Sequence, residues 1–200
     1  MGYTSIVRDT YNKVAKKYFD SRGAFHNEEQ LEKFIELAIP GGTVLDLGCG
    51  SGVPVDRFLV DKGFKVTGLD ISEEQIKLAK KYVPEAVYVV KNMSDLTEGE
   101  YSVDAVVSFY AIFHVPRVTQ QDLFKKIYSY LKVGGPLLVT MATTDWEGVD
   151  ENFYGEKMYE SHFGPIKNSQ MVKEASFEIM FNDIDTTGNE KHQIILARKV

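Results

Sequence analysis

The sequence of 200 residues is poor in the groups that hold secreted, metal-dependent or membrane folds together. Its one cysteine, Cys49, cannot form an internal disulfide bond, and no cysteines and histidines have the spacing of a zinc site. The longest apolar tract, roughly residues 105–115, is interrupted by Ser108 and His114 and is shorter than the ~20 residues of a membrane-spanning helix. No secretory leader with its apolar core is apparent in the first residues. We therefore expect a cytoplasmic protein with no metal site and no membrane span.

Positive charge is in the minority as well. The chain has 23 lysine and arginine residues against 29 aspartate and glutamate residues, which gives a formal net charge of −6. Proteins that coat nucleic acids are usually strongly basic. We therefore expect no nucleic-acid partner, while the charge balance indicates no particular small ligand and no residue pattern indicates an oligomeric state. The length fits a single domain over residues 1–200 whose core can be buried without disulfide bonds.

Short apolar segments alternate with helical patterns along most of the chain. Parallel strands that are neighbours in a sheet need helical crossovers, so this alternation predicts an α/β fold, doubly wound, with helices on both faces of a mostly parallel sheet. The C-terminal part differs, because its two strand-like segments are separated by turn-forming residues and predict an antiparallel hairpin at one edge. Seven strands are expected, at residues 43–47, 64–69, 86–90, 103–109, 137–141, 177–181 and 193–197.

A glycine-rich turn follows the first of these strands, in the stretch Val44–Gly52. Its three alternating glycines permit close approach of the backbone to a ligand. Asp70 ends the second strand, 24 residues after Asp46, where a carboxylate can accept hydrogen bonds from the two hydroxyls of a ribose. A dinucleotide-binding turn needs a third glycine at the position of Val53, and a Walker phosphate loop is absent too. The pattern therefore favours a nucleoside ligand and weakens the hypothesis of a nicotinamide cofactor.

These segments resemble motifs of the class I S-adenosylmethionine-dependent methyltransferases of the small-molecule type. Leu45–Gly52 is similar to their first motif, and Gly68–Ile71 to their second. In the same order along the chain, Asn92–Leu96 resembles the loop after the third strand, Asp104–Phe109 the fourth strand, and Leu131–Leu138 the turn into the fifth. The resemblance implies a Rossmann-like methyltransferase fold, with S-adenosyl-L-methionine as cofactor and S-adenosyl-L-homocysteine as its product.

The resemblance also implies where the cofactor binds. The backbone of the glycine turn would approach the methionyl part, Asp70 would hold the ribose hydroxyls, and Ile71 would pack on the adenine. Asn92 stands where the family usually has an acid, and its oxygen can still accept from the adenine amino group. The full set of implied cofactor residues is Asp46, Gly48, Cys49, Gly50, Asp70, Ile71, Asn92, Met93 and Ser108, with Met93 covering the ring and Ser108 near the reacting methyl group.

Two aromatic-rich segments flank the matched region. Within residues 1–27, apolar residues at helical spacing place Tyr11 and Tyr18 on one face of a helix, which either closes over the cofactor, as in similar methyltransferases, or packs on the core. Residues 142–172 form an insertion of unusual aromatic density for a surface loop. It is expected either to cover the acceptor as a lid or to pack beneath the C-terminal hairpin; its candidate lid residues are Trp146, Tyr159 and His162.

His114 is the candidate catalytic residue, because it follows the fourth strand and so lies on the ligand side of the sheet. Methyl transfer by in-line displacement requires a positioned acceptor and, for a hydroxyl or protonated amine, a base. A histidine held by nearby backbone is the alternative role for His114, and His162 is the second candidate base. The sequence therefore predicts methyl transfer to a small-molecule acceptor. A nicotinamide-linked oxidoreductase and a non-catalytic S-adenosylmethionine-binding protein are the alternatives.

Overall fold

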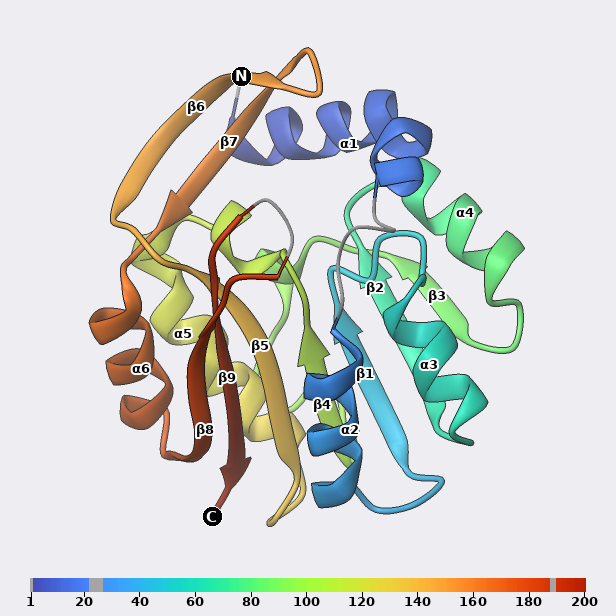
Figure 1. Cartoon of the computed structure of the whole chain (residues 1–200), viewed down its shortest axis with the longest axis vertical. Helices are drawn as coiled ribbons and strands as arrows, with labels where there is room; N and C mark the ends of the chain where they lie inside the picture. Colours follow the sequence, from blue (N-terminus) through green and yellow to red (C-terminus); the bar gives the residue numbers. More distant parts are fainter. Residues whose placement is uncertain (1, 22–26, 188–189) are drawn as a thin grey trace.

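A seven-stranded sheet forms the centre of the computed structural model, which describes residues 2–21, 27–187 and 190–200. The strand order is β3-β2-β1-β4-β5-β9-β8 (Figure 1). Five strands pair in parallel: β1 (Thr43–Leu47), β2 (Lys65–Asp70), β3 (Val87–Val90), β4 (Ala105–Ser108) and β5 (Pro136–Ala142). The strand β9 (His192–Lys199) runs antiparallel between β5 and β8 (Phe177–Asp185). The predicted mostly parallel sheet with an antiparallel C-terminal hairpin is confirmed.

Helices cover both faces of the sheet, because the side chains of each strand alternate between the faces. In β1, Leu45 and Leu47 belong to one buried cluster and Val44 to the other. Both faces of the central strands are apolar, as a sheet covered on both sides requires. One face carries α2 (Glu28–Leu37), α3 (Val55–Asp61) and α4 (Glu73–Tyr82), and the other carries α5 (Arg117–Tyr130) and α6 (Pro165–Glu174).

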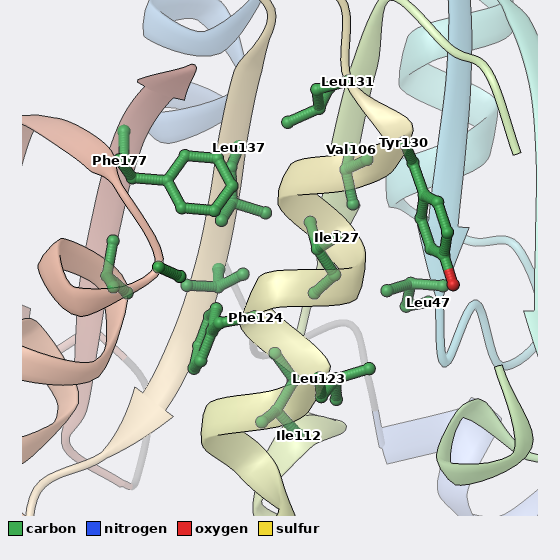
Figure 2. Packing of buried hydrophobic residues seen from close by; sticks show 14 of the residues in the cluster. Leu47, Val106, Ile112, Leu123, Phe124, Ile127, Tyr130, Leu131, Leu137 and Phe177 are labelled. Carbon is green, nitrogen blue, oxygen red and sulfur yellow. The ribbon is translucent and has the colours of Figure 1, made fainter. Parts of the chain in front are cut away.

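The largest buried cluster lies between α5 and the sheet. Figure 2 shows the apolar stripe of α5 against strand residues that include Leu47, Val106 and Leu137. Tyr130 ends this stripe with its ring buried, and its hydroxyl donates to the Thr97 carbonyl at 2.7 Å. The buried residues of α5 are Gln120, Leu123, Phe124, Ile127 and Tyr130.

The predicted insertion divides into two parts. The strands β6 (Trp146–Phe153) and β7 (Glu156–His162) form a separate two-stranded sheet, which lies against α1 (Tyr3–Ser21), while α6 packs against β8. The two residues between β6 and β7, Tyr154 and Gly155, both have positive φ, of 54° and 91°, which matches the tight turn that hairpins favour. The segment is thus divided: its hairpin lies at the helix α1, and its helix packs against β8 of the C-terminal hairpin.

The N-terminal helix lies within the predicted segment of residues 1–27. It begins at Tyr3 and is described to Ser21, and residues 22–26 of the predicted segment lie outside the described residues. Within the described ranges, none of the helices combines the length and the apolar character needed to cross a membrane.

We expect Ile127→Ala to lower the free energy of unfolding by about 2–5 kcal/mol, because Ile127 is fully buried and truncation leaves a cavity. Val118 of the same helix is 81% exposed, and Val118→Ala should stay within about 0.5 kcal/mol of the unchanged protein. Chemical denaturation of both variants measures the difference. Equal stabilities would contradict the packing of α5 on the sheet.

Candidate functional site

A cavity that opens to solvent, with about 630 Å³ of empty space including its mouth, lies at the carboxyl ends of β1, β2 and β4. The strand order reverses between β1 and β4, which is where doubly wound sheets bind their ligands. Its walls are the glycine turn after β1, the end of β2, the short helix η2 (Met93–Asp95), and residues 109–115, which include the short helix η3 (Ile112–His114). The helix α1 closes the remaining side.

The glycine turn presents bare backbone to this cavity. The amides of Gly48 and Cys49 both donate to the Leu69 carbonyl, at 2.7 and 2.9 Å, so the turn is fastened to β2. Gly48 has φ of +83°, and a Cβ atom there would lie 2.2 Å from the Cβ of Ala111. Any side chain at Gly48 would therefore collide with the opposite wall.

Asp70 lies beside this turn and lines the cavity. Its Oδ2 accepts from the Gly50 amide at 2.9 Å, and its Oδ1 accepts from the Ser72 amide at 2.8 Å. Burial raises the pKa of Asp70 to about 6, although these amide donors act against the rise. Each carboxylate oxygen keeps a further lone pair for a ligand hydroxyl.

The adenine-side residues expected from the sequence line the same cavity. Ile71 follows Asp70 directly, and Asn92 and Met93 come from the segment after β3. The Oδ1 of Asn92 accepts from the Ser94 amide at 3.0 Å and so caps η2. Asn92 is thereby fixed in orientation, with one lone pair of that oxygen already used inside the chain.

His114 ends η3 and reaches the cavity from the side opposite the glycine turn. Its Nδ1 lies 2.8 Å from the carbonyl oxygen of Tyr159, which can only accept, so Nδ1 carries the proton. Its Nε2 lies 3.0 Å from the Tyr11 hydroxyl. Burial lowers the pKa of His114, against the opposing effect of the Tyr159 carbonyl, so the ring is neutral at pH 7. Nε2 is therefore a hydrogen-bond acceptor.

Comparison with known proteins identifies this arrangement. A family model described as a methyltransferase domain matches residues 44–135. The chain is 33% identical over 192 residues to a 2-methyl-6-phytyl-1,4-hydroquinone methyltransferase of Synechocystis, an alignment covering 92% of this chain and 58% of that protein. The chain spans about half the length of the curated relatives it matches.

Two solved structures share the fold at 16% identity. One is magnesium protoporphyrin IX methyltransferase of Synechocystis with bound S-adenosylmethionine, with a TM-score of 0.76 over 100% of this chain and 98% of that one. The other is the [4+2]-cyclase SpnF, with a TM-score of 0.76 over 100% and 97%. Residues 44–135 therefore match a methyltransferase domain, and the whole chain shares the fold of a structure that binds S-adenosylmethionine.

The residues of this methyltransferase domain fit that cofactor. The glycine turn leaves room that a Cβ at Gly48 would fill, and Asp70 offers acceptor lone pairs to a ribose. Ile71 and Met93 supply apolar surface to the same cavity, as an adenine ring requires. These residues would hold the cofactor with its nucleoside between β2 and η2.

Three of the expected cofactor residues do not line this cavity. Ser108 is fully buried, and its Oγ donates to the Leu47 carbonyl at 2.6 Å, which joins β4 to β1, so its side chain does not line the cavity. Asp46 of β1 and Cys49 of the glycine turn instead line a smaller adjoining pocket with Tyr18. Burial raises the pKa of the Cys49 thiol well above its usual range.

Tyr11 and Tyr18 of α1 do line the cavity of the methyltransferase domain. Their ring centroids are 5.3 Å apart, and Phe153 of the hairpin contacts both, with centroids at 5.7 and 6.1 Å. Polar contacts hold α1 in this position: Asn12 Oδ1 accepts from Ser72 Oγ at 2.6 Å. On its other side, α1 contacts β7. The helix therefore closes the cavity as well as packing on the domain.

The three lid residues expected in the insertion lie outside this cavity. Trp146 is 40% exposed, with its ring against His162. The Tyr159 hydroxyl donates to Glu147 at 2.7 Å, so Tyr159 contributes its backbone carbonyl to the site and not its ring. His162 Nδ1 faces the Thr144 carbonyl. In β7, the side chains of Tyr159 and His162 bond to other groups of the chain and do not line the cavity.

Two further residues line the cavity, Tyr110 and Gln75, and neither belongs to a motif that the sequence predicted as part of the site. Tyr110 lies in the wall with φ of +55°, a conformation that bulky residues rarely adopt. Its amide donates to Thr140 Oγ1 at 2.5 Å and its hydroxyl bonds to the side chain of Asn27, and these contacts hold it there. Gln75 reaches the cavity from the first turn of α4. Its helical position was predictable, but its orientation toward the cavity was not.

Asp70→Asn should weaken binding of S-adenosylhomocysteine by about 1.5–3 kcal/mol, the range for a hydrogen bond to a charged group. In the unchanged protein the affinity should fall as the pH is lowered through about 6, because protonation of Asp70 removes an acceptor. Above that pH the carboxylate is already formed and the affinity should be flat. Calorimetry from pH 5 to 8 measures both effects, and the asparagine variant serves as the pH-independent control. A variant with the original dissociation constant at pH 7.5 would remove Asp70 from the site.

Proposed function

We propose that this chain transfers the methyl group of S-adenosylmethionine to a small-molecule acceptor, with His114 as general base. The observation that carries the proposal is one cavity in which the cofactor residues and a neutral imidazole nitrogen converge. When bound, S-adenosylmethionine supplies an electrophilic methyl group on its sulfonium, and the acceptor heteroatom displaces the sulfur in line.

The role of His114 follows from its hydrogen bonds. The Tyr159 carbonyl fixes the proton on Nδ1, which leaves the lone pair of Nε2 directed at the cavity. In this structure the Tyr11 hydroxyl donates a hydrogen bond to that lone pair. An acceptor hydroxyl that takes the place of the Tyr11 hydroxyl would donate to Nε2 and pass its proton there as the new bond to carbon forms.

The walls beyond the cofactor residues favour a compact and largely apolar acceptor. They are formed mostly by aromatic and aliphatic side chains, namely Tyr3, Val7, Tyr11, Tyr18, Phe109 and Val115. Lys91 at the cavity is ion-paired with Glu100. The hydroquinone named for the Synechocystis relative is similar in its aromatic ring and hydroxyl groups, but its long phytyl chain makes it larger than this type of acceptor. We propose a neutral acceptor with one such hydroxyl or amino group.

The cytoplasm is the compartment that we propose for this activity, since Cys49 is a lone, buried thiol and the described chain needs no oxidising environment. A second candidate function follows from the likeness to the [4+2]-cyclase SpnF, whose name denotes ring formation on the same fold. In that case the cavity would bind S-adenosylmethionine without transferring its methyl group.

His114→Ala should lower kcat by about 10²–10⁴-fold, the usual contribution of a general base, and change cofactor affinity by less than about twofold. His162→Ala is the matched control, because His162 lies outside the cavity, and it should retain kcat. Steady-state rates, cofactor titration and melting temperature are measured on both variants. Undiminished kcat in a folded His114→Ala protein would exclude it as base, whereas joint loss of stability and cofactor binding would support the alternative structural role.

Purified protein should bind S-adenosylmethionine and S-adenosylhomocysteine with micromolar-scale dissociation constants and should not bind NAD, because Val53 stands where a dinucleotide turn needs glycine. Calorimetry tests binding, and transfer of isotopically labelled methyl groups into a metabolite extract tests turnover. Binding without transfer into any fraction would favour the second candidate function. Binding of NAD alone would refute both.

A further inference from the structure

Gln75 is a buried side-chain amide that the chain itself leaves unpaired. It is 1% exposed, and neither its Oε1 nor its Nε2 has a hydrogen-bond partner among the described residues. Leaving a buried polar group unpaired costs about 1–3 kcal/mol. Since Gln75 lines the cofactor cavity, a ligand there can supply the missing partner.

The local structure explains why the amide is unpaired. Ser72 and Gln75 have the spacing of a capping box, in which each side chain bonds the backbone amide of the other residue. Only one of these two hydrogen bonds forms: Ser72 Oγ accepts from the backbone amide of Gln75 at 3.1 Å. The Ser72 amide donates to Asp70 Oδ1 at 2.8 Å instead. Asp70 has taken the bond that Gln75 would otherwise make, so the Gln75 side chain remains available to the cavity.

The position of Gln75 indicates which part of the cofactor it meets. A Cβ atom added to Gly50 would lie 3.8 Å from Gln75 Oε1, so the amide faces the glycine turn. Gly50 is also the residue whose amide donates to Asp70 Oδ2, at 2.9 Å. Gln75, Gly50 and Asp70 therefore share the ribose corner of the cavity.

The ribose corner has a carboxylate acceptor but needs a donor. A ribose hydroxyl that donates its proton to Asp70 keeps lone pairs on its oxygen. The Gly50 amide cannot donate to these lone pairs, because it already donates to Asp70. The amide group of Gln75 has two N–H donors and no use for them within the described chain.

We propose that Gln75 is a cofactor-positioning residue whose Nε2 donates to the ribose hydroxyl that Asp70 accepts from. The ribose is then held from both sides, by an acceptor and a donor, and its orientation is fixed relative to the glycine turn. This inference rests on the proposed function through the S-adenosyl ligand alone and requires no particular acceptor or base.

Gln120 provides a matched control. It is also a fully buried glutamine, but its Nε2 donates to the carbonyls of Ile112, Val115 and Ser161, at 3.2, 2.9 and 2.7 Å. Methionine has nearly the length of glutamine and no amide. Gln120→Met therefore removes three internal hydrogen bonds, whereas Gln75→Met removes none.

The experiment measures melting temperature without ligand and S-adenosylhomocysteine affinity by calorimetry. Gln75→Met should bind about 3- to 10-fold more weakly, the fold-change expected for one neutral hydrogen bond, with an unchanged or raised melting temperature. Gln120→Met should show the opposite pattern, with a lowered melting temperature and an affinity within about twofold at a temperature where it is folded. Weaker binding by Gln75→Met together with a lowered melting temperature would assign Gln75 a structural role and overturn the proposal.

Analogues of S-adenosylhomocysteine that lack the 2′ or the 3′ hydroxyl identify the contact. With the analogue that lacks the bonded hydroxyl, the unchanged protein and Gln75→Met should bind alike, because the donor has lost its partner. If Gln75→Met binds both analogues and S-adenosylhomocysteine more weakly than the unchanged protein by the same factor, the assignment to a ribose hydroxyl is overturned. Failure of the unchanged protein to bind S-adenosylhomocysteine would refute the proposed function itself, whereas equal binding by the two proteins would refute the role of Gln75 alone.

Discussion

Asp70 joins the three segments that form the nucleoside end of the cavity. It ends β2, and its carboxylate accepts from Gly50 in the glycine turn and from Ser72 at the start of α4. Without these bonds the turn and the helix would each have an unpaired buried amide beside a ligand site. The conformation of the turn, the first turn of α4 and the free amide of Gln75 all follow from this one carboxylate.

Much of the fold was predictable because local pattern and tertiary structure agree between β1 and β5. The alternating apolar residues of β1 face two buried layers, and the glycines meet a real steric limit at Gly48. Such constraints leave a recognisable pattern in the sequence. The hairpin β6–β7 left no such pattern, since β6 is largely exposed and the tight turn depends on the left-handed conformation of Tyr154 as well as Gly155.

The candidate site was predictable to a lesser degree. Spacing along the chain placed Asp70, Asn92 and His114 at the ligand side, because the carboxyl ends of parallel strands share one edge. It could not show that the Ser108 hydroxyl bonds to the Leu47 carbonyl of β1, nor that Trp146 and His162 line a different pocket from that of Asp70. Those outcomes depend on which neighbour satisfies each polar group, and such neighbours come from segments distant in sequence.

The hydrogen bond from His114 to the Tyr159 carbonyl has a consequence for how this enzyme can diverge. A main-chain carbonyl is present whatever residue occupies position 159, so the contact that sets the tautomer of the imidazole survives substitution there. Selection would then act on the path of the β7 backbone and on the length of the hairpin. An insertion or deletion that shifts the register of β7 would move this carbonyl away from His114, while a change of side chain at position 159 would leave the carbonyl in place.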